Sequence, residues 1–262
     1  MLQTLRFRVL TSAGTLIALL GLTHGLAAAQ TNSHKNHTPV LVELFTAEGC
    51  SSCPPADTLL ARLENEQPVA GVDIIVLGEH VDYWDQLGWR DRFSSPLFTE
   101  RQHGYGFRLK VNDIYTPQMV VDGTEQFVGN DAAHALRAIS QAGRRAKIAL
   151  VLSKPVLDGH RVATTVSLNA PSSALPKADL YAALVDPADT TDVGGGENRG
   201  HTLHHVAVVR ALQRIGRLQN LGTGPVKATL DAPPGSLPKN MRVVVFAQAS
   251  CAGPIVGVAQ SQ

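Results

Sequence analysis

Two cysteines separated by two residues stand where a strand pattern gives way to a helix pattern. Residues 40–45 form a β-rich apolar run that ends in a turn of small residues at Gly49, and residues 56, 59, 60 and 63 are apolar at helical spacing. The N–H groups that begin a helix are unpaired and favour negative charge, so a Cys50 thiolate is stabilised there. Cys53 follows one turn later, close enough to attack a mixed disulfide through Cys50. We expect the Cys50 sulfur to be the more exposed and Cys53 to be shielded.

The two-cysteine motif alone is compatible with three kinds of site. It could be half of a zinc site, a structural staple or a redox pair. A zinc site needs a second pair of ligands, and the one further cysteine, Cys251, has no cysteine near it. A staple that closes so small a loop constrains the unfolded chain little. The strand and helix on either side favour a Cys50–Cys53 disulfide that is redox-active, with soft-metal binding as the next interpretation.

The first 29 residues have the pattern of a secretory signal peptide. Arg6 and Arg8 make the start basic, residues 9–22 are mostly apolar, and residues 27–29 read Ala-Ala-Ala. This predicts cleavage after Ala29, and the apolar stretch is shorter than the ~20 residues of a spanning helix. We therefore expect an exported protein, periplasmic or secreted, with no stable membrane insertion after cleavage. Residues 30–38 are polar and are expected to form a flexible lead-in.

Composition limits the remaining possibilities. The formal net charge of +1 argues against a general nucleic-acid partner. Three cysteines are too few for a disulfide framework, so a hydrophobic core must hold the fold. About 230 residues follow the leader, enough for one large or two small domains. Nothing in the sequence calls for a cofactor.

A second buried strand leads to another group of polar and aromatic residues. Residues 72–77 form a nearly continuous apolar run, and His80, Asp82 and Trp84 follow it. Strand, helix and strand of this length predict a βαβ unit, whose carboxyl edge would carry these residues together with Cys50. His80 could exchange a proton with Cys50 or stabilise its thiolate, or it could simply bond to nearby backbone. Trp84 could line a substrate groove or cap the core below a long loop.

The next strand begins with a proline. Pro117 stands at a position that a sheet tolerates, and Asp122-Gly123 predicts a hairpin after it. The element order with the two cysteines after the first strand and Thr116-Pro117 before the third resembles the thioredoxin fold. The resemblance implies that the Thr116–Pro117 bond is cis, that it lies against Cys50, and that Thr116 offers backbone hydrogen bonds to a bound peptide.

Several motifs resemble a narrower family, the secreted bacterial domain-of-unknown-function 1223 family, which has a thioredoxin-like fold. The resemblance runs over nearly all of the mature chain. Its motifs are Glu43-Leu44-Phe45-Thr46, Gly49-Cys50-Ser51-Ser52-Cys53-Pro54-Pro55-Ala56-Asp57, His80-Val81-Asp82-Tyr83-Trp84-Asp85, Tyr115-Thr116-Pro117-Gln118 and Gly196-Glu197-Asn198-Arg199-Gly200. The aromatic-CGPC stretch of ordinary thioredoxins is absent here, so the resemblance leaves the redox direction open.

Beyond residue 146 alternating strand patterns replace the mixture of strands and helices. Residues 162–168, 180–185, 226–230 and 242–247 have strand patterns, and residues 208–215 are the one helix-like stretch. We predict an α/β thioredoxin-like domain over residues 39–146 and a small β-sandwich-like domain over residues 147–262. Cys251 is expected to be a buried, inert thiol.

A glycine-rich loop stands out in this second half. Residues 194–196 are glycines, and no Gly-Lys-Ser/Thr follows them, so the loop is not a phosphate-binding loop. Glu197 and Arg199 could pair with each other or reach the first domain. His204 and His205 would face opposite sides of a strand, so few of the histidines here could converge on a metal ion.

The sequence as a whole favours an exported thiol–disulfide oxidoreductase. Cys50 would attack protein or small-molecule thiols and disulfides, Cys53 would resolve the mixed disulfide, and His80 would assist them. Thr116, Pro117 and Trp84 would bind the substrate. Two alternatives remain open: handling of a soft metal such as copper by Cys50, Cys53 and His80, or a non-enzymatic envelope binding module.

Overall fold

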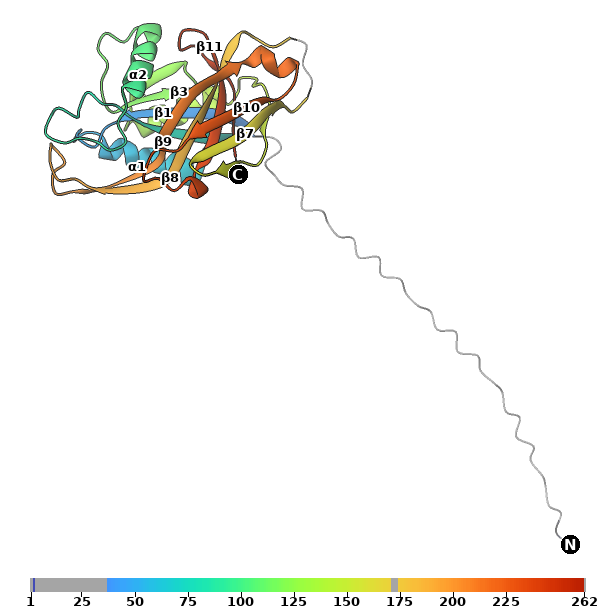
Figure 1. Cartoon of the computed structure of the whole chain (residues 1–262), viewed down its shortest axis with the longest axis horizontal. Coiled ribbons are helices and arrows are strands. Elements are labelled where there is room, and N and C mark those ends of the chain that lie inside the picture. Colours follow the sequence, from blue (N-terminus) through green and yellow to red (C-terminus); the bar gives the residue numbers. More distant parts are fainter. Residues whose placement is uncertain (1, 3–36, 171–173, 262) are drawn as a thin grey trace. The chain divides into compact units, whose positions relative to one another are not determined.

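The structure is a computed structural model that describes Leu2, residues 37–170 and residues 174–261 (Figure 1). The proposed signal peptide, residues 1–29, lies outside these residues apart from Leu2, as does the lead-in up to residue 36. The helices are α1 (Pro54–Glu66), α2 (Pro96–Leu109), α3 (Ala132–Ala142), η2 (Leu218–Gly222) and η3 (Pro238–Asn240). The strands are β1 (Thr38–Thr46), β2 (Val72–His80), β3 (Gln118–Val121), β4 (Glu125–Val128), β5 (Leu150–Leu152), β6 (Val156–Asp158), β7 (Arg161–Leu168), β8 (Ala178–Asp192), β9 (Thr202–Arg217), β10 (Val226–Asp231), β11 (Arg242–Ala249) and β12 (Ile255–Gln260).

Most of the strands form one mixed sheet of α/β architecture. Its order is β12-β11-β8-β9-β2-β1-β3-β4. β1 pairs in parallel with β2, as the predicted βαβ unit requires, and antiparallel with β3, which forms the predicted hairpin with β4. The carboxyl ends of β1 and β2 therefore lie at the same edge of the sheet, with Thr46 opposite His80.

β1 is buried on both faces, which explains its apolar sequence. Glu43 is the exception, and it accepts a 2.5 Å hydrogen bond from the Tyr105 hydroxyl on α2. Phe45 faces the same helix and meets the Tyr105 ring edge-on, with ring centroids 6.0 Å apart. Leu44, which stands between Glu43 and Phe45 in the sequence, points to the other face of the sheet. There its side chain and that of Ala56 on α1 both lie next to Gly129. Figure 1 accordingly shows α1 and α2 on opposite sides of the β1 region.

The expected division into domains over residues 39–146 and 147–262 differs from the structure. Strands β8, β9, β11 and β12 extend the first sheet, and the described residues from 37 onward belong to one compact unit. The residues 208–215 that looked helical lie inside β9. β9 reaches β2 through the pair Gly78 and Val208, where a Cβ on residue 78 would lie 3.1 Å from the Val206 carbonyl oxygen. Gly78 therefore allows the close approach of β9 that joins the two halves.

A smaller sheet packs against the second half of the large one. Its order is β10-β7-β5, and β6 also pairs with β7. Alternate residues of β8 face two different cores: Leu180, Ala182 and Leu184 pack toward the small sheet, whereas Ala183 and Val185 belong to the core shared with α1. Sandwich-like packing is thus present, but one of its two sheets is the large sheet itself.

Candidate functional site

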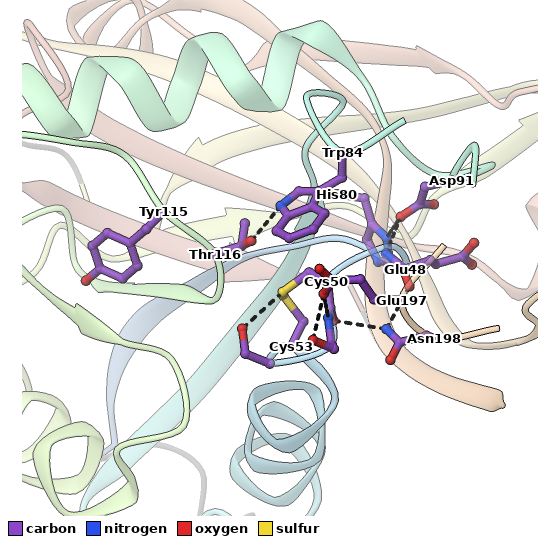
Figure 2. The surroundings of a disulfide bond; sticks show 12 residues. Glu48, Cys50, Cys53, His80, Trp84, Asp91, Tyr115, Thr116, Glu197 and Asn198 are labelled. Atoms are coloured by element: carbon purple, nitrogen blue, oxygen red, sulfur yellow. Dashed lines mark hydrogen bonds and ion pairs between the residues drawn. A yellow bond between two sulfur atoms is a disulfide. The ribbon is translucent and has the colours of Figure 1, made fainter. Parts of the chain in front are cut away.

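The two cysteines form a disulfide where β1 gives way to α1. Cys50 ends the turn after β1, Cys53 caps α1, and their Cα atoms are 5.4 Å apart (Figure 2). The turn is held by backbone hydrogen bonds from Cys50 N to Ala47 O (3.2 Å) and from Cys53 N to Cys50 O (3.1 Å). Pro54 and Pro55 occupy the first helical positions, where their missing N–H groups leave no bond broken.

Both cysteines are fully buried, contrary to the expected asymmetry. Each is 0% exposed, and they pack in a small apolar cluster with Phe45, Val81 and Tyr105. The serines between them are exposed instead. The expectation was wrong because position at a helix start says nothing about the loops that fold over the turn.

The first covering element is Trp84, in the loop after β2. Its Nε1 donates a 2.8 Å hydrogen bond to Thr116 Oγ1, and its side chain packs beside Gly49 and the apolar cluster of the cysteines. Figure 2 shows Trp84 and Thr116 on one side of the disulfide. The Thr116–Pro117 peptide bond is cis, as the resemblance implied. Trp84 therefore joins the cysteine turn to the loop that leads into β3.

The second covering element is the glycine-rich loop, which joins β8 to β9. Glu197 Oε2 accepts hydrogen bonds from Ser51 N (3.0 Å) and Ser51 Oγ (2.6 Å). The buried Asn198 donates from Nδ2 to Glu48 O (2.8 Å) and Cys50 O (3.0 Å). The loop thus reaches the cysteine turn, one of the two possibilities that the sequence left open for Glu197.

The glycines of this loop are required by close packing. A Cβ at residue 194 would lie 3.0 Å from the Trp89 ring, and one at residue 196 would lie 3.1 Å from Trp89 Cβ. At residue 195 a Cβ would collide with the Gly88 carbonyl oxygen. Gly196 also has φ +67°, which disfavours other residues. The loop after β2 and the glycine-rich loop therefore fit together without room for side chains.

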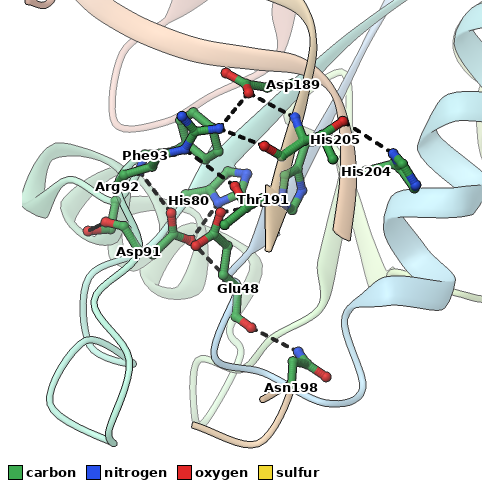
Figure 3. A network of polar contacts seen from close by, with 12 residues as sticks. Glu48, His80, Asp91, Arg92, Phe93, Asp189, Thr191, Asn198, His204 and His205 are labelled. Carbon is green, nitrogen blue, oxygen red and sulfur yellow. Dashed lines mark hydrogen bonds and ion pairs between the residues drawn. The ribbon is translucent and has the colours of Figure 1, made fainter. Parts of the chain in front are cut away.

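His80 is buried and belongs to a network of polar contacts (Figure 3). Its Nδ1 is 2.6 Å from Asp91 Oδ2, and Asp91 also accepts hydrogen bonds from Glu48 N and Phe93 N. Burial alone would lower the pKa of His80, but the carboxylates around it, Asp91 foremost, together outweigh burial and hold that pKa above its ordinary value. Burial likewise opposes ionisation of Asp91, yet the His80 charge and these hydrogen bonds keep the Asp91 pKa below its usual range.

Glu48 connects this network to the cysteine turn. Its Oε2 accepts a 2.7 Å hydrogen bond from Trp89 Nε1, and its Oε1 lies 3.5 Å from His205 Nε2. His205 is buried, and its ring meets that of His80 edge-on with centroids 4.8 Å apart. Asp57, one turn after Cys53, lies near both histidines, and its burial raises its pKa although their charges oppose the rise.

The family follows from comparison with known proteins. The family described as "Protein of unknown function (DUF1223)" matches residues 41–248. The chain belongs to the DUF1223 family. The matched residues contain both cysteines, the loops that cover them and the polar network, so the whole candidate site lies within the DUF1223 region.

The chain also resembles solved structures. The DUF1223 chain is similar to the X-ray crystal structure of protein AGR_C_4864 from Agrobacterium tumefaciens, with 28% sequence identity, a TM-score of 0.64, and coverage of 85% of this chain and 93% of that chain. A domain of the outer membrane lipoprotein Omp28 from Porphyromonas gingivalis matches at 16% identity and a TM-score of 0.26 over 45% of this chain and 88% of that chain, too weak a likeness to carry an argument. No curated protein matches the chain.

Two further findings concern features that the sequence raised. Cys251 is exposed in the turn between β11 and β12, with φ +57°, and is not the buried thiol expected. It was misjudged because the apolar residues around it in sequence belong to strands, whereas it occupies the turn itself. Within residues 37–170 and 174–261 no three His, Cys, Asp or Glu side chains are grouped to hold a metal ion, and no helix there is long and apolar enough to cross a membrane.

The site also contains residues whose role sequence reasoning missed. Asn198 and Glu48 hold the cysteine turn, and His205 and Asp91 surround His80. A signal existed for Asn198, because it stands next to Glu197 in the Gly-Glu-Asn motif of the glycine-rich loop. No signal linked His205 to His80, since only the pairing of β9 with β2 brings them together.

Proposed function

We propose that this DUF1223 protein catalyses thiol–disulfide exchange through Cys50 and Cys53. The observation that carries the proposal is the disulfide at the start of α1, around which loops from three distant parts of the chain meet. A disulfide between residues three apart adds little stability by itself, since the loop it closes is small. The contacts that three loops make around the disulfide are better explained by a chemical role of the two sulfurs than by a purely structural disulfide.

We further propose that the cysteines belong to a thioredoxin-like substructure within the sheet. The supporting features are the strand order β2-β1-β3-β4, the parallel β1 and β2 joined through α1, and the antiparallel β3 that Pro117 precedes. In this arrangement Thr116 and Pro117 stand beside the cysteine turn, to which Trp84 links them. They would form the surface against which a partner's sulfur is presented.

In this function the two cysteines divide the exchange between them. The Cys50 thiolate attacks a partner disulfide, forms a Cys50–partner S–S bond and releases one partner thiol. The Cys53 thiolate then attacks the Cys50 sulfur, re-forms the Cys50–Cys53 disulfide and releases the second partner thiol. Two electrons pass from the protein to the partner, and the two thiol protons end on the released thiols. Run backwards, the same steps oxidise a partner dithiol.

Cys50 is the better placed of the two to attack. It is followed directly by the exposed Ser51 and Ser52, and its Sγ lies 3.4 Å from Ser52 Oγ. The Ser52 hydroxyl can donate a hydrogen bond to a thiolate at that position. Cys53 instead stands at the start of the helix, and Asp57 follows it one turn later. Because both sulfurs are covered, a partner gains access when Trp84 or the glycine-rich loop moves aside.

We also propose that the chain is exported. The support lies in its first residues, with the basic start, apolar stretch and Ala-Ala-Ala site, which fall outside the described residues. An oxidising compartment is one in which a Cys50–Cys53 disulfide persists.

A catalytic assay tests the proposed function. Dithiothreitol reduces a disulfide-bonded peptide slowly, and a catalytic amount of the protein should accelerate release of the peptide thiols. Cys251→Ser should keep the full rate, whereas replacement of both Cys50 and Cys53 by serine should abolish the acceleration. Equal rates with and without that double replacement would contradict the proposal.

A further inference from the structure

We infer that the surroundings of Cys50 and Cys53 hold the pair toward its disulfide form and that Glu197 strengthens this bias. The reduced protein is therefore an electron donor to partner disulfides. The inference rests on the proposed function and gives it a direction. The reduction potential of such a pair depends on how well its environment stabilises the thiolate of the reduced form relative to the disulfide.

Most of the backbone donors that usually stabilise a thiolate at a helix start are already in use. Cys53 N is bonded to Cys50 O, and the N–H groups of Ala56 and Asp57 are bonded to Cys53 O. Residues 54 and 55 are prolines and have no N–H group. Ser51 N donates to Glu197. Of the side chains described in this turn, Ser52 remains as a donor near Cys50 Sγ, at 3.4 Å.

Glu197 adds a negative charge to this depleted turn. Its carboxylate accepts both the hydroxyl and the backbone N–H of Ser51, the residue next to Cys50. These hydrogen bonds hold the pKa of Glu197 below its ordinary value, so the side chain is ionised at neutral pH. Like charges repel, so the carboxylate disfavours a Cys50 thiolate and leaves the neutral disulfide unaffected.

Burial of the cysteines acts in the same direction. The cysteines are 0% exposed, and burial in apolar surroundings disfavours a thiolate. Arg199 lies in the same loop as Glu197 and is exposed, and it is the residue of that loop that carries a permanent positive charge.

The direction that follows is reduction of the partner. The protein dithiol and a partner disulfide give the protein disulfide and two partner thiols, with two electrons passing to the partner and both protons retained by its thiols. An external dithiol restores the protein by the reverse exchange at Cys50 and Cys53. Because the disulfide form is favoured, this donor must be a strong reductant, and a monothiol such as glutathione is too weak.

Redox equilibria of matched variants test the inference. Full-length mature protein carrying Cys251→Ser is equilibrated with reduced and oxidised dithiothreitol or glutathione, and the oxidised fraction is read by thiol alkylation and mass. Glu197→Gln keeps the shape of the side chain and should move the equilibrium toward the dithiol by about twofold to fivefold, the range of an exposed charge interaction. Ser52→Ala removes the remaining side-chain donor and should move the equilibrium the opposite way. Arg199→Gln is the matched control on the same loop.

The outcomes separate the inference from the proposed function. We expect the wild-type pair to stay oxidised in glutathione buffers and to be reduced by dithiothreitol, and the Glu197→Gln shift to shrink at high salt. The inference is overturned, while exchange itself stands, if glutathione reduces the wild-type pair or if Glu197→Gln does not shift the redox equilibrium. It is also overturned if the Glu197→Gln shift is no larger than the shift of Arg199→Gln, which removes a positive charge and acts in the opposite direction. If the folded protein exchanges with neither reagent, the proposed function fails, and the inference fails with it.

Discussion

Replacing Asn198 by alanine removes the side chain that ties the glycine-rich loop to the cysteine turn. The Nδ2 group donates to Glu48 O and Cys50 O, at 2.8 and 3.0 Å, and the side chain is buried. Each hydrogen bond contributes about 1 kcal/mol net, and a buried acceptor left without a donor adds a further cost. Cys50 O keeps its bond from Cys53 N, so this added cost falls mainly on Glu48 O. Asn198→Ala should therefore lower the free energy of unfolding by about 2–3 kcal/mol.

Urea unfolding of the oxidised protein measures this loss. Trp84 and Trp89 are the protein's tryptophans and both lie at the site, so their fluorescence follows it. The neighbouring exposed residue provides the control, since Arg199→Ala should change the free energy of unfolding by less than about 0.5 kcal/mol. If Asn198→Ala is as mild as this control, with the same dependence on urea, then the loop is not held to the turn as described.

Three further predictions concern the covers and the buried network. Trp84→Ala should expose the disulfide and speed its reduction by a water-soluble phosphine several-fold; an unchanged rate would mean that Trp84 does not limit access. His80 has a raised folded-state pKa because of Asp91, so its contribution to stability is complete below the unfolded pKa of about 6.5 and is lost as pH rises through the folded value. The difference in unfolding free energy between wild type and His80→Gln should thus shrink from pH 6 to pH 9, and a constant difference would contradict this. Gly195→Ala should push the loop off Gly88 and, by fluorescence, disturb the tryptophan environment of the native state. Gly222→Ala should not, because its Cβ would meet Leu175 Cδ1 in ordinary contact at 3.9 Å.

The part of the fold that is local in sequence could be predicted. The apolar run of β1, the helical spacing after Cys53 and the second run of β2 each reflect one element and its immediate neighbours. These patterns placed both cysteines and His80 at one sheet edge, as the register of Thr46 opposite His80 confirms.

The pairing of β9 with β2 could not be predicted, because nothing local to either strand names its partner. Alternation in β8 and β11 is the same whether they form a separate sandwich or extend the first sheet. Gly78 was the one hint, since a glycine within a buried strand often marks a close backbone approach. Without knowledge of that pairing, the sequence could not assign the glycine-rich loop and His205 to the site.

The burial of the cysteines was missed for the same reason. Trp84 and the glycine-rich loop come from distant parts of the chain, and their contacts with the cysteine turn are tertiary. Glu197 is a further case: its motif was visible in the sequence, but the hydrogen bonds to Ser51 that give it a redox role were not.

The division of work between the two cysteines tests the central claim most directly. Reduced Cys53→Ser protein, in the Cys251→Ser background, is treated with oxidised glutathione, and its mass is measured after native quenching. The account predicts one glutathione attached at Cys50 by a stable mixed disulfide, far less attachment in the matching Cys50→Ser protein, and an unmodified Cys50–Cys53 disulfide when both cysteines are present. Equal attachment to the two single-cysteine proteins, or none to either, would contradict it.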